Sequence, residues 1–333
     1  MTEEKIDIHA HFIPPFYQEA CLKTGHGKPD GMPTIPEWSE EAHLELMRKT
    51  SISKAILSIS SPGVHLSSED TEFNKQLAME CNDFASDLVH RSPMNFGFWA
   101  SLPLPDVEGS LSEIARVFDG MNAVGFTMET NHHGVYLGDP SLDAVFNELN
   151  RIKAKVFIHP TTPCFQRINE SEHRHTAVTC LPQYPNPMME FMFDTTRALI
   201  NLFASGTIAR CPDITFVVPH AGGALPPVLQ RFCSFSIMIM KSEIDLSLQA
   251  VKETLRRQFY FDLAGFPFPD QVHGLLRIVG PERLLYGSDY PFTPPQVVVG
   301  LVKLMSVGLK KTFEDGDVRE GIYFLNAKRL LGE

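Results

Sequence analysis

The residues best able to do chemistry in this chain of 333 residues are histidines and an aspartate at the ends of apolar runs. Ile6-Asp7-Ile8-His9-Ala10-His11 places two imidazoles two residues apart. In a strand, side chains i and i+2 point to one face, so His9 and His11 would converge where one metal ion could bind. Three later apolar runs close with similar residues, namely His159, His220 and Asp289. This pattern predicts a metalloenzyme built on a barrel.

Eight short runs rich in apolar, β-branched or aromatic residues predict the strands that must position these side chains. The runs are Lys5–His11, Lys54–Ser60, Asn95–Ser101, Ala123–Glu129, Lys155–His159, Ile214–His220, Phe259–Ala264 and Leu284–Asp289. Helical patterns lie between and after them, at Glu40–Lys49, Thr71–His90, Leu111–Phe118, Ser141–Lys153, Asp194–Arg210, Leu225–Lys241, Leu246–Gln258, Asp270–Val279, Gln296–Val307 and Phe313–Leu331.

Strands alternating with helices imply βαβ units and a parallel sheet. Repeated over this length, they favour a single α/β domain spanning 1–333: a distorted (β/α)₈ TIM-like barrel with extra loops and C-terminal helices. A doubly wound sheet is the alternative, but no G-x-G-x-x-G follows the first strand. Two stretches rich in proline or glycine, about 21–38 and about 161–187, predict an irregular insertion and a long loop. Long loops of this kind are typical of lids and binding elements.

Composition excludes several classes of protein. A hydrophobic content of 43% can bury a large core, while a formal net charge of -11 argues against a nucleic-acid surface or an anionic membrane as partner. No apolar run reaches the length of a transmembrane helix, and Thr2-Glu3-Glu4-Lys5 does not resemble a signal peptide. Six cysteines without a C-x-x-C pair suggest reduced thiols in a cytoplasmic enzyme.

In such a barrel the carboxyl ends of the strands face one shared site. Histidine nitrogens with one carboxylate suit Zn²⁺, with Mn²⁺ as the alternative, and leave a position open for water or substrate. Each residue alone has a simpler interpretation: an H-x-H pair can lie at the surface, His159 can be a core histidine and Asp289 a helix cap. Their joint placement at separate strand ends favours the metal site. Asp262 could support that site or act as a cap, whereas His132, His133, His173 and His175 are expected at the surface.

Four motifs occur in a characteristic order: D-I-H-A-H, F-I-H-P, P-H-A-G-G-A-L-P and Y-G-S-D-Y-P-F. The ordered set resembles the aminocarboxymuconate-semialdehyde decarboxylase family of the amidohydrolase superfamily, from Lys5 to about Leu331. Pro187-Met188-Met189-Glu190-Phe191 and Asp194-Thr195-Thr196-Arg197 are most similar to the fungal 6-methylsalicylate decarboxylases within it.

The resemblance implies a metal-dependent decarboxylase without an organic cofactor on a distorted barrel. It implies His9, His11, His159 and Asp289 as metal ligands and His220 as a nearby catalytic histidine. It also implies a homodimer, in which Arg231 could reach the neighbouring subunit's site.

Two departures from the family pattern narrow the expected substrate. Resorcylate-type members resemble this chain but carry a carboxylate at the position of His9 and a glutamate at that of Gly223, which disfavours 2,6-dihydroxybenzoate here. The muconate-semialdehyde enzyme carries an arginine that grips a second carboxylate. The corresponding region here reads His43-Leu44-Glu45, with Arg48 offset, which favours a monocarboxylate.

The expected reaction is non-oxidative loss of CO₂ from a small ortho-hydroxy aromatic acid, with 6-methylsalicylate going to 3-methylphenol as the leading example. Protonating the ring carbon first avoids an aryl carbanion; Asp289 is the first candidate donor and His220 the second. Apolar side chains would line a ring-shaped slot, with Phe12, Met188, Phe191 and Phe292 as candidates. The alternatives are a metal-dependent hydrolase of a lactone or amide, and a non-catalytic metal-binding protein.

Overall fold

Eight parallel strands form the central sheet of the computed structural model, which describes residues 3–166, 175–177, 181 and 183–333. The strands follow the order of the sequence around the sheet. They are β1 (Lys5–His11), β2 (Ile52–Ser58), β3 (Phe96–Ser101), β4 (Gly125–Glu129), β7 (Lys155–His159), β10 (Thr215–Val218), β11 (Phe259–Asp262) and β12 (Leu284–Leu285).

The two edges of this sheet meet. Isolated parallel bridges join Asp7 to Tyr286 and Ala10 to Tyr290, and the Ile8 N–H donates to the Tyr286 carbonyl at 3.0 Å. The segment around β12 therefore closes onto β1, and the predicted (β/α)₈ barrel is confirmed. A doubly wound open sheet is excluded, because such a sheet keeps two free edges and reverses its strand order.

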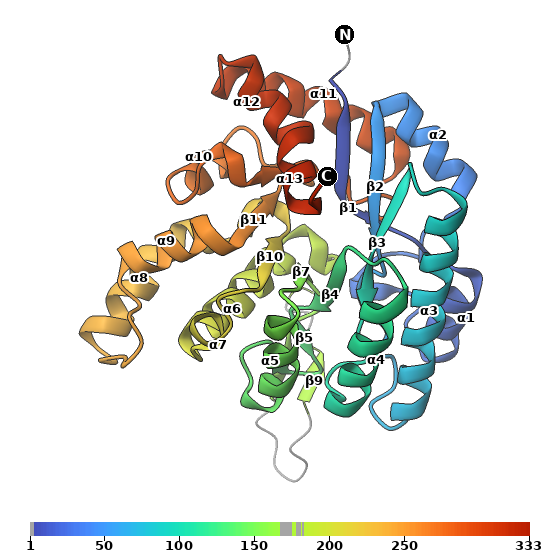
Figure 1. The fold of residues 1–333 in the computed structure, drawn as a ribbon, viewed down its shortest axis with the longest axis horizontal. Helices are drawn as coiled ribbons and strands as arrows, with labels where there is room; N and C mark the ends of the chain where they lie inside the picture. The colour runs from blue at the N-terminus through green and yellow to red at the C-terminus, as the bar shows by residue number, and fades with distance from the viewer. Residues whose placement is uncertain (1–2, 167–174, 178–180, 182) are drawn as a thin grey trace.

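Helices surround the barrel on its outside (Figure 1). They are α1 (Pro15–Lys23), α2 (Glu40–Thr50), α3 (Thr71–Arg91), α4 (Val107–Gly120), α5 (Asp143–Arg151), α6 (Glu190–Ala204), α7 (Thr207–Arg210), α8 (Leu225–Met238), α9 (Leu248–Gln258), α10 (Gln271–Leu276), α11 (Pro295–Thr312), α12 (Gly316–Glu320) and α13 (Asn326–Leu331). Several of these helices have a side-chain cap at their N-terminus. For example, the hydroxyl of Ser39 accepts the N–H of Ala42 at 3.2 Å. Within the described ranges, no helix has the length and apolar character needed to cross a bilayer.

Several predicted boundaries were wrong. The strands expected to reach His220 and Asp289 end earlier, at Val218 and Leu285. The helix expected over 194–210 is α6 followed by α7, because Gly206 adopts a φ of +80° between them. The helix expected over 313–331 is α12, a π-helical turn η6 (Gly321–Leu325) and α13.

The loops contain short elements that the sequence analysis did not predict. Helix α1 begins at Pro15, just before the predicted insertion, and that insertion contains the 3₁₀ turn η1 (Pro29–Gly31). A hairpin of β5 (Asn131–His132) and β6 (Val135–Tyr136) follows β4. Part of the loop over 161–187 lies outside the described residues; the remainder contains β8 (Cys164–Gln166), β9 (His175–Ala177) and the turn η3 (Asn186–Met188).

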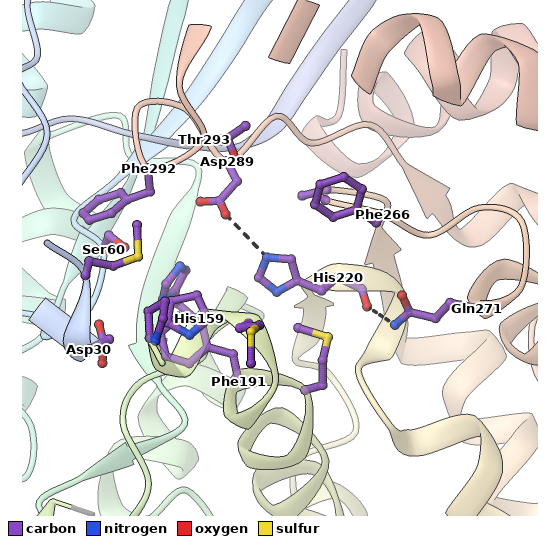
Figure 2. A pocket seen from close by; sticks show the side chains of 17 residues that line it. Asp30, Ser60, His159, Phe191, His220, Phe266, Gln271, Asp289, Phe292 and Thr293 are labelled. Atoms are coloured by element: carbon purple, nitrogen blue, oxygen red, sulfur yellow. Dashed lines mark hydrogen bonds and ion pairs between the residues drawn. The ribbon is translucent and has the colours of Figure 1, made fainter. Parts of the chain in front are cut away.

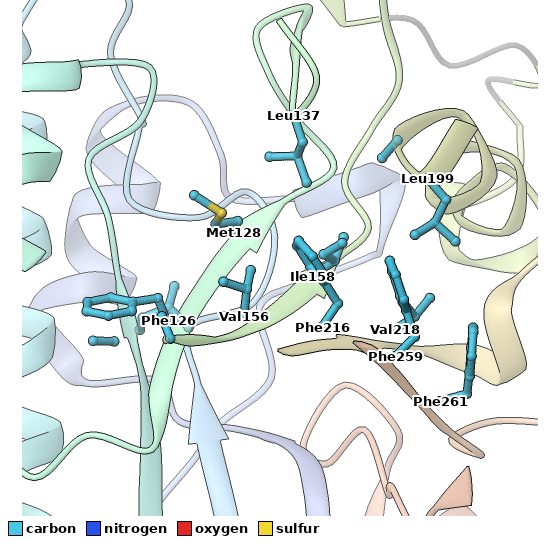
Figure 3. Packing of buried hydrophobic residues seen from close by; sticks show 14 of the residues in the cluster. Phe126, Met128, Leu137, Val156, Ile158, Leu199, Phe216, Val218, Phe259 and Phe261 are labelled. Carbon is cyan, nitrogen blue, oxygen red and sulfur yellow. The ribbon is translucent and has the colours of Figure 1, made fainter. Parts of the chain in front are cut away.

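Apolar residues fill both faces of the strands, which is why each strand reads as a continuous apolar run. In β10, Phe216 and Val218 join the large cluster between the strands and the helices, part of which is shown in Figure 3. Val217, between them, belongs to a second cluster inside the barrel. This alternation is the two-residue period of a strand, and it fixes which side chains can face the barrel axis.

The interior cluster directly supports the carboxyl end of β1. The indole Nε1 of Trp99 donates to the Ile8 carbonyl at 3.1 Å, and its ring stacks on Phe157 with centroids 5.8 Å apart. Phe157 in turn lies edge-on to His9, at 5.0 Å. Ala327 and Leu330 of α13 pack into the same cluster.

Candidate metal centre and adjoining pocket

Four predicted ligands meet at the carboxyl end of the barrel. One donor atom from each of His9, His11, His159 and Asp289 lies within 4.8 Å of the others. Asp289 Oδ1 is 3.1 Å from His11 Nε2 and 3.5 Å from His9 Nε2. The three histidines are buried and Asp289 is half-buried. Residues separated by up to 280 positions are thus brought together by barrel closure.

These residues fit a divalent cation. His9 Nε2 is buried without a hydrogen-bond partner among the described residues, although it faces the other donors. Two ligands of one ion at about 2.0–2.2 Å lie at most about 4.4 Å apart, so donors gathered within 4.8 Å need only a small movement to contact a single ion. Three imidazole nitrogens and one carboxylate are ligands that both Zn²⁺ and Mn²⁺ accept.

Hydrogen bonds orient two of these imidazoles. His9 Nδ1 lies 3.0 Å from Asp262 Oδ2, and His11 Nδ1 lies 3.0 Å from Ser58 Oγ. With Nδ1 engaged in this way, Nε2 of each ring is the nitrogen that faces the cluster. Partners of this kind fix the tautomer and the ring orientation of metal-binding histidines.

Asp262 supports the centre and also organises the chain beside it. Its Oδ1 accepts the backbone N–H of Ala264 at 2.9 Å and that of His220 at 3.1 Å. The two roles that the sequence left open for this residue are therefore both present: one carboxylate oxygen orients His9 and the other caps a turn.

The electrostatics of the cluster favour a cation. Burial lowers the pKa of His9, but Asp262 and Asp289 outweigh burial and raise it to about 9. Burial lowers the pKa of His11 and of His159. Burial raises the pKa of Asp289, yet the surrounding histidines, led by His9, hold it well below its usual range. Neutral His11 and His159 beside an ionised Asp289 are the states in which these groups bind metals, whereas His9, with a pKa of about 9, would have to release its proton to an ion.

Left-handed backbone places His220 and Asp289, with φ of 52° and 58°. This region is rarely occupied by residues other than glycine, so surrounding contacts must hold it. The Asp289 N–H donates to the His9 carbonyl at 2.8 Å, and Gln271 Nε2 donates to the His220 carbonyl at 2.7 Å. These kinks end the strands early and bring His220 Nε2 to 3.6 Å from Asp289 Oδ2.

A cavity of about 460 Å³ opens beside the cluster (Figure 2). His159, His220 and Asp289 form part of its wall, and most of the remaining lining is apolar. No lysine or arginine lines the cavity within the described part of the chain. Its volume is typical of small-molecule sites, and its apolar lining suits a ring more than a second charged group.

Three of the predicted substrate contacts, Met188, Phe191 and Phe292, line this cavity. Phe12 does not: it is buried in the core, stacked on Phe84 at 5.9 Å. Successive strand residues point to opposite faces, so the residue after His11 turns away from the site. Arg231 lies on α8 beside Phe232 and Phe235, along a separate apolar depression.

Other positions singled out in the sequence have structural surroundings. His43 is buried and accepts a hydrogen bond from Trp38 Nε1 at 3.0 Å, while Arg48 is exposed. His132 is also buried, so its predicted surface position was wrong; His133 is exposed. His173 lies outside the described residues, and the side chain of His175 is not described.

Asp30, Ser60 and Gln271 line the cavity but were missed by the sequence analysis. Asp30 belongs to the irregular insertion, where no periodic pattern indicates which side chains face inward. Gln271 begins α10 and was within a predicted helix, but nothing in a helical pattern reveals a contact with the backbone of His220.

Comparison with known proteins places this geometry in a family. The sequence profile described as amidohydrolase matches residues 6–332. The chain belongs to the amidohydrolase family. This amidohydrolase is 34% identical over 309 residues to the decarboxylase yanB of Aspergillus niger, covering 91% of this chain and 81% of the relative. It is 33% identical over 299 residues to the 6-methylsalicylic acid decarboxylase of Penicillium expansum, covering 89% and 87%. The resemblance inferred from the four motifs is confirmed.

Solved structures show the same fold. A crystal structure described as an amidohydrolase II superposes with a TM-score of 0.86 at 32% identity, covering 99% of this chain and all of the other. A dihydroxybenzoic acid decarboxylase of Polaromonas, solved with bound manganese, superposes with a TM-score of 0.79 at 18% identity, covering 99% of this chain and 97% of the other. The second likeness concerns the fold alone.

Proposed function

We propose that this amidohydrolase is a metal-dependent, non-oxidative decarboxylase of a small ortho-hydroxy aromatic acid, with 6-methylsalicylate as its reference substrate. The observation that carries the proposal is the group of four converging donors in the wall of an apolar cavity, beside His220. The relatives at 33–34% identity that are named as decarboxylases support the same reaction class.

His9, His11, His159 and Asp289 would hold one divalent ion, with Zn²⁺ proposed and Mn²⁺ as the alternative, and no organic cofactor is required. Such an ion supplies Lewis-acid chemistry, since it can bind the substrate carboxylate with the ortho hydroxyl and withdraw charge from them.

The residues of the protein must deliver a proton to the ring carbon that carries the carboxylate. We propose Asp289 Oδ2 as the donor, because it lies beside both the cluster and the cavity; since the surrounding histidines hold this carboxyl ionised, it must first take up a proton, which water can supply. His220 Nε2, 3.6 Å from Asp289 Oδ2, is placed to return a proton to Asp289, and it is the second candidate donor. The ring carbon gains this proton, the carbon–carboxylate bond breaks, and its electron pair restores the aromatic ring as CO₂ leaves.

Apolar side chains would hold the ring over these groups. Phe292 stands edge-on to His11 at 5.5 Å, and Phe191 stands edge-on to His159 at 6.2 Å. Both line the cavity. Fixing the ring in one orientation and excluding water contributes to the rate, because the reacting atoms no longer have to find one another.

His220→Ala tests this proposal. We expect the variant to lose decarboxylation of 6-methylsalicylate by about 100-fold or more, the usual range for a proton-transfer group, while it still binds one ion per chain. Metal analysis and CO₂ release would be measured on the same preparation. Chelation should abolish activity in the wild type, and readdition of Zn²⁺ or Mn²⁺ identifies the working ion. Water uptake without CO₂ release would instead indicate the hydrolase alternative.

We also propose that the protein is a homodimer located in the cytoplasm. The end of α8 and the residues after it expose a run of large apolar side chains, which we name the α8 apolar surface: Phe235, Ile237, Met238, Ile239 and Met240. Arg231 lies on the same helix, so a second copy docking there would bring it close to the neighbouring subunit. The five described cysteines are buried free thiols, which agrees with a reducing compartment.

A further inference from the structure

Asp30 is the only carboxyl group besides Asp289 among the described residues that line the cavity. Figure 2 shows it with Ser60 on the side of the cavity opposite Gln271 and His220. The proposed mechanism gives it no role. A carboxyl group in a largely apolar wall is costly unless something hydrogen-bonds to it.

The carboxyl of Asp30 is held in one position. Its Oδ1 accepts the Thr162 backbone N–H at 3.0 Å and the Thr162 hydroxyl at 2.6 Å. The Thr162 hydroxyl also accepts from Asn186 Nδ2 at 2.8 Å. Asp30 itself adopts a left-handed φ of 53°, a strained conformation that these contacts maintain. The turn η1 and the loop after β7 are thereby joined at the wall of the cavity.

Acceptor capacity remains on this carboxyl. An ionised carboxylate offers about four lone-pair sites, and the two hydrogen bonds from Thr162 both go to Oδ1. No ion pair joins Asp30 to any residue in the described ranges, and its charged neighbours include Asp194. Burial raises the pKa of Asp30, while the Thr162 and Ser61 donors lower it. A donor from a ligand would therefore find an acceptor that the protein has left available.

A monohydroxy acid leaves this acceptor unused. If the carboxylate and ortho hydroxyl of 6-methylsalicylate face the metal ligands, the rest of its ring offers only C–H bonds and a methyl group. A second hydroxyl on that part of the ring would donate to Asp30. We propose that Asp30 determines substrate specificity by accepting a hydrogen bond from a second ring hydroxyl. This inference rests on the proposed function and deepens it. The preferred substrate is then an ortho-hydroxy acid with a further hydroxyl at position 3, 4 or 5.

Asp30→Asn is the decisive variant. Asparagine keeps an Oδ1 for both Thr162 donors but places an N–H₂ group where the second carboxylate oxygen was, so it donates where aspartate accepts. The experiment measures kcat/KM of the metal-loaded enzyme for 6-methylsalicylate and for its 3-, 4- and 5-hydroxy derivatives. Comparing the wild type with the variant on each acid cancels the intrinsic reactivity that an added hydroxyl brings.

We expect at least one hydroxylated acid to lose about 10-fold or more in kcat/KM in D30N, as loss of a hydrogen bond to a charged group predicts. The loss for 6-methylsalicylate should be smaller than for that acid by about threefold or more, because 6-methylsalicylate makes no such bond. Two controls accompany it. T162V weakens the attachment of Asp30 but keeps the acceptor, so it should preserve the substrate ranking. D245N alters a similar aspartate at an exposed turn and should change nothing.

Equal losses on all four acids in D30N would overturn the inference and leave the proposed decarboxylase intact, as would unchanged values on all four. Failure of the wild type to release CO₂ from any of them would overturn the proposed function together with this inference.

Discussion

Asp262 shows how one buried side chain controls the state of another. Its Oδ2 faces His9 Nδ1, while its Oδ1 accepts two backbone N–H groups. An aspartate at this position keeps the proton of His9 on Nδ1 and leaves the Nε2 lone pair for an ion.

Asp262→Asn should therefore weaken metal binding by about 10- to 100-fold. The Asn carbonyl can still accept from the backbone, but its amide donates to His9 Nδ1 and drives the proton to Nε2, where the ion would bind. Competition with a chelator of known affinity measures the effect. D245N serves as the matched control, and an unchanged affinity in D262N would contradict the assigned orientation.

The buried imidazole of His43 predicts that the stability of the protein depends on pH. Burial, assisted by the nearby His11, lowers the pKa of His43 to about 3, whereas an unfolded histidine titrates near about 6.5. Between these two pKa values His43 binds a proton in the unfolded chain but stays neutral in the folded chain. The stabilisation is therefore complete above about pH 6.5 and is lost as pH falls toward 3, by up to about 1.4 kcal/mol per pH unit.

His43→Gln should flatten this dependence. Glutamine can still accept from Trp38 Nε1 but does not titrate. Denaturant unfolding at pH 7 and pH 5 should show a smaller loss of stability in the variant than in the wild type. His132, whose pKa is also lowered to about 3 by burial, contributes with the same sign to both proteins, so the difference isolates His43. Parallel losses in the two proteins would refute the assignment.

At the level of secondary-structure elements, the turn after His220 controls the packing of α6. Gly223 adopts φ 60° and ψ −132°, and a Cβ there would lie 2.5 Å from the carbonyl oxygen of Met192. That carbonyl accepts the Ala224 N–H at 3.1 Å. A side chain such as that of glutamate therefore has no room at this position.

Gly223→Ala should destabilise the protein by about 2 kcal/mol or more, because it combines backbone strain with a clash against main-chain atoms. Met192 lines the cavity, so KM for 6-methylsalicylate should rise as well. Gly120→Ala is the control, since a Cβ there meets nothing within 4 Å. Equal melting temperatures for the two variants would show that the turn is more adaptable than its geometry implies.

For the molecule as a whole, the α8 apolar surface predicts self-association. Met238 and Ile239 are 73% and 65% exposed, and contiguous apolar patches of this kind mark interfaces. Met238→Asp with Ile239→Asp should convert a dimer to a monomer in sedimentation experiments. Met94→Asp is the control, because Met94 is 81% exposed and lies in the turn between α3 and β3. A wild type that is monomeric at all concentrations would refute the proposed dimer.

The barrel could be predicted from the sequence because strands buried on both faces leave continuous apolar runs, and barrel geometry brings their ends together. His9, His11 and His159 could be recognised for the same reason. The left-handed turns that carry His220 and Asp289 could not be predicted from the sequence, since neither histidine nor aspartate alone indicates such a conformation. Asp30 could not either: its position depends on Thr162 and Asn186, contacts between irregular segments that only tertiary packing creates. The prediction that Phe12 lines the cavity was wrong, because the alternation of side chains along a strand turns the residue after His11 away from the site.

The stack of Trp99 on Phe157, and of Phe157 against His9, has a practical consequence. Only two tryptophans occur in the chain, and the other, Trp38, lies in a separate aromatic group with Phe12 and Phe84. Replacing Trp38 with phenylalanine would leave Trp99, beneath the histidines, as the single tryptophan. Its fluorescence emission would then change when an ion binds to the histidines, so metal binding could be followed without an added dye.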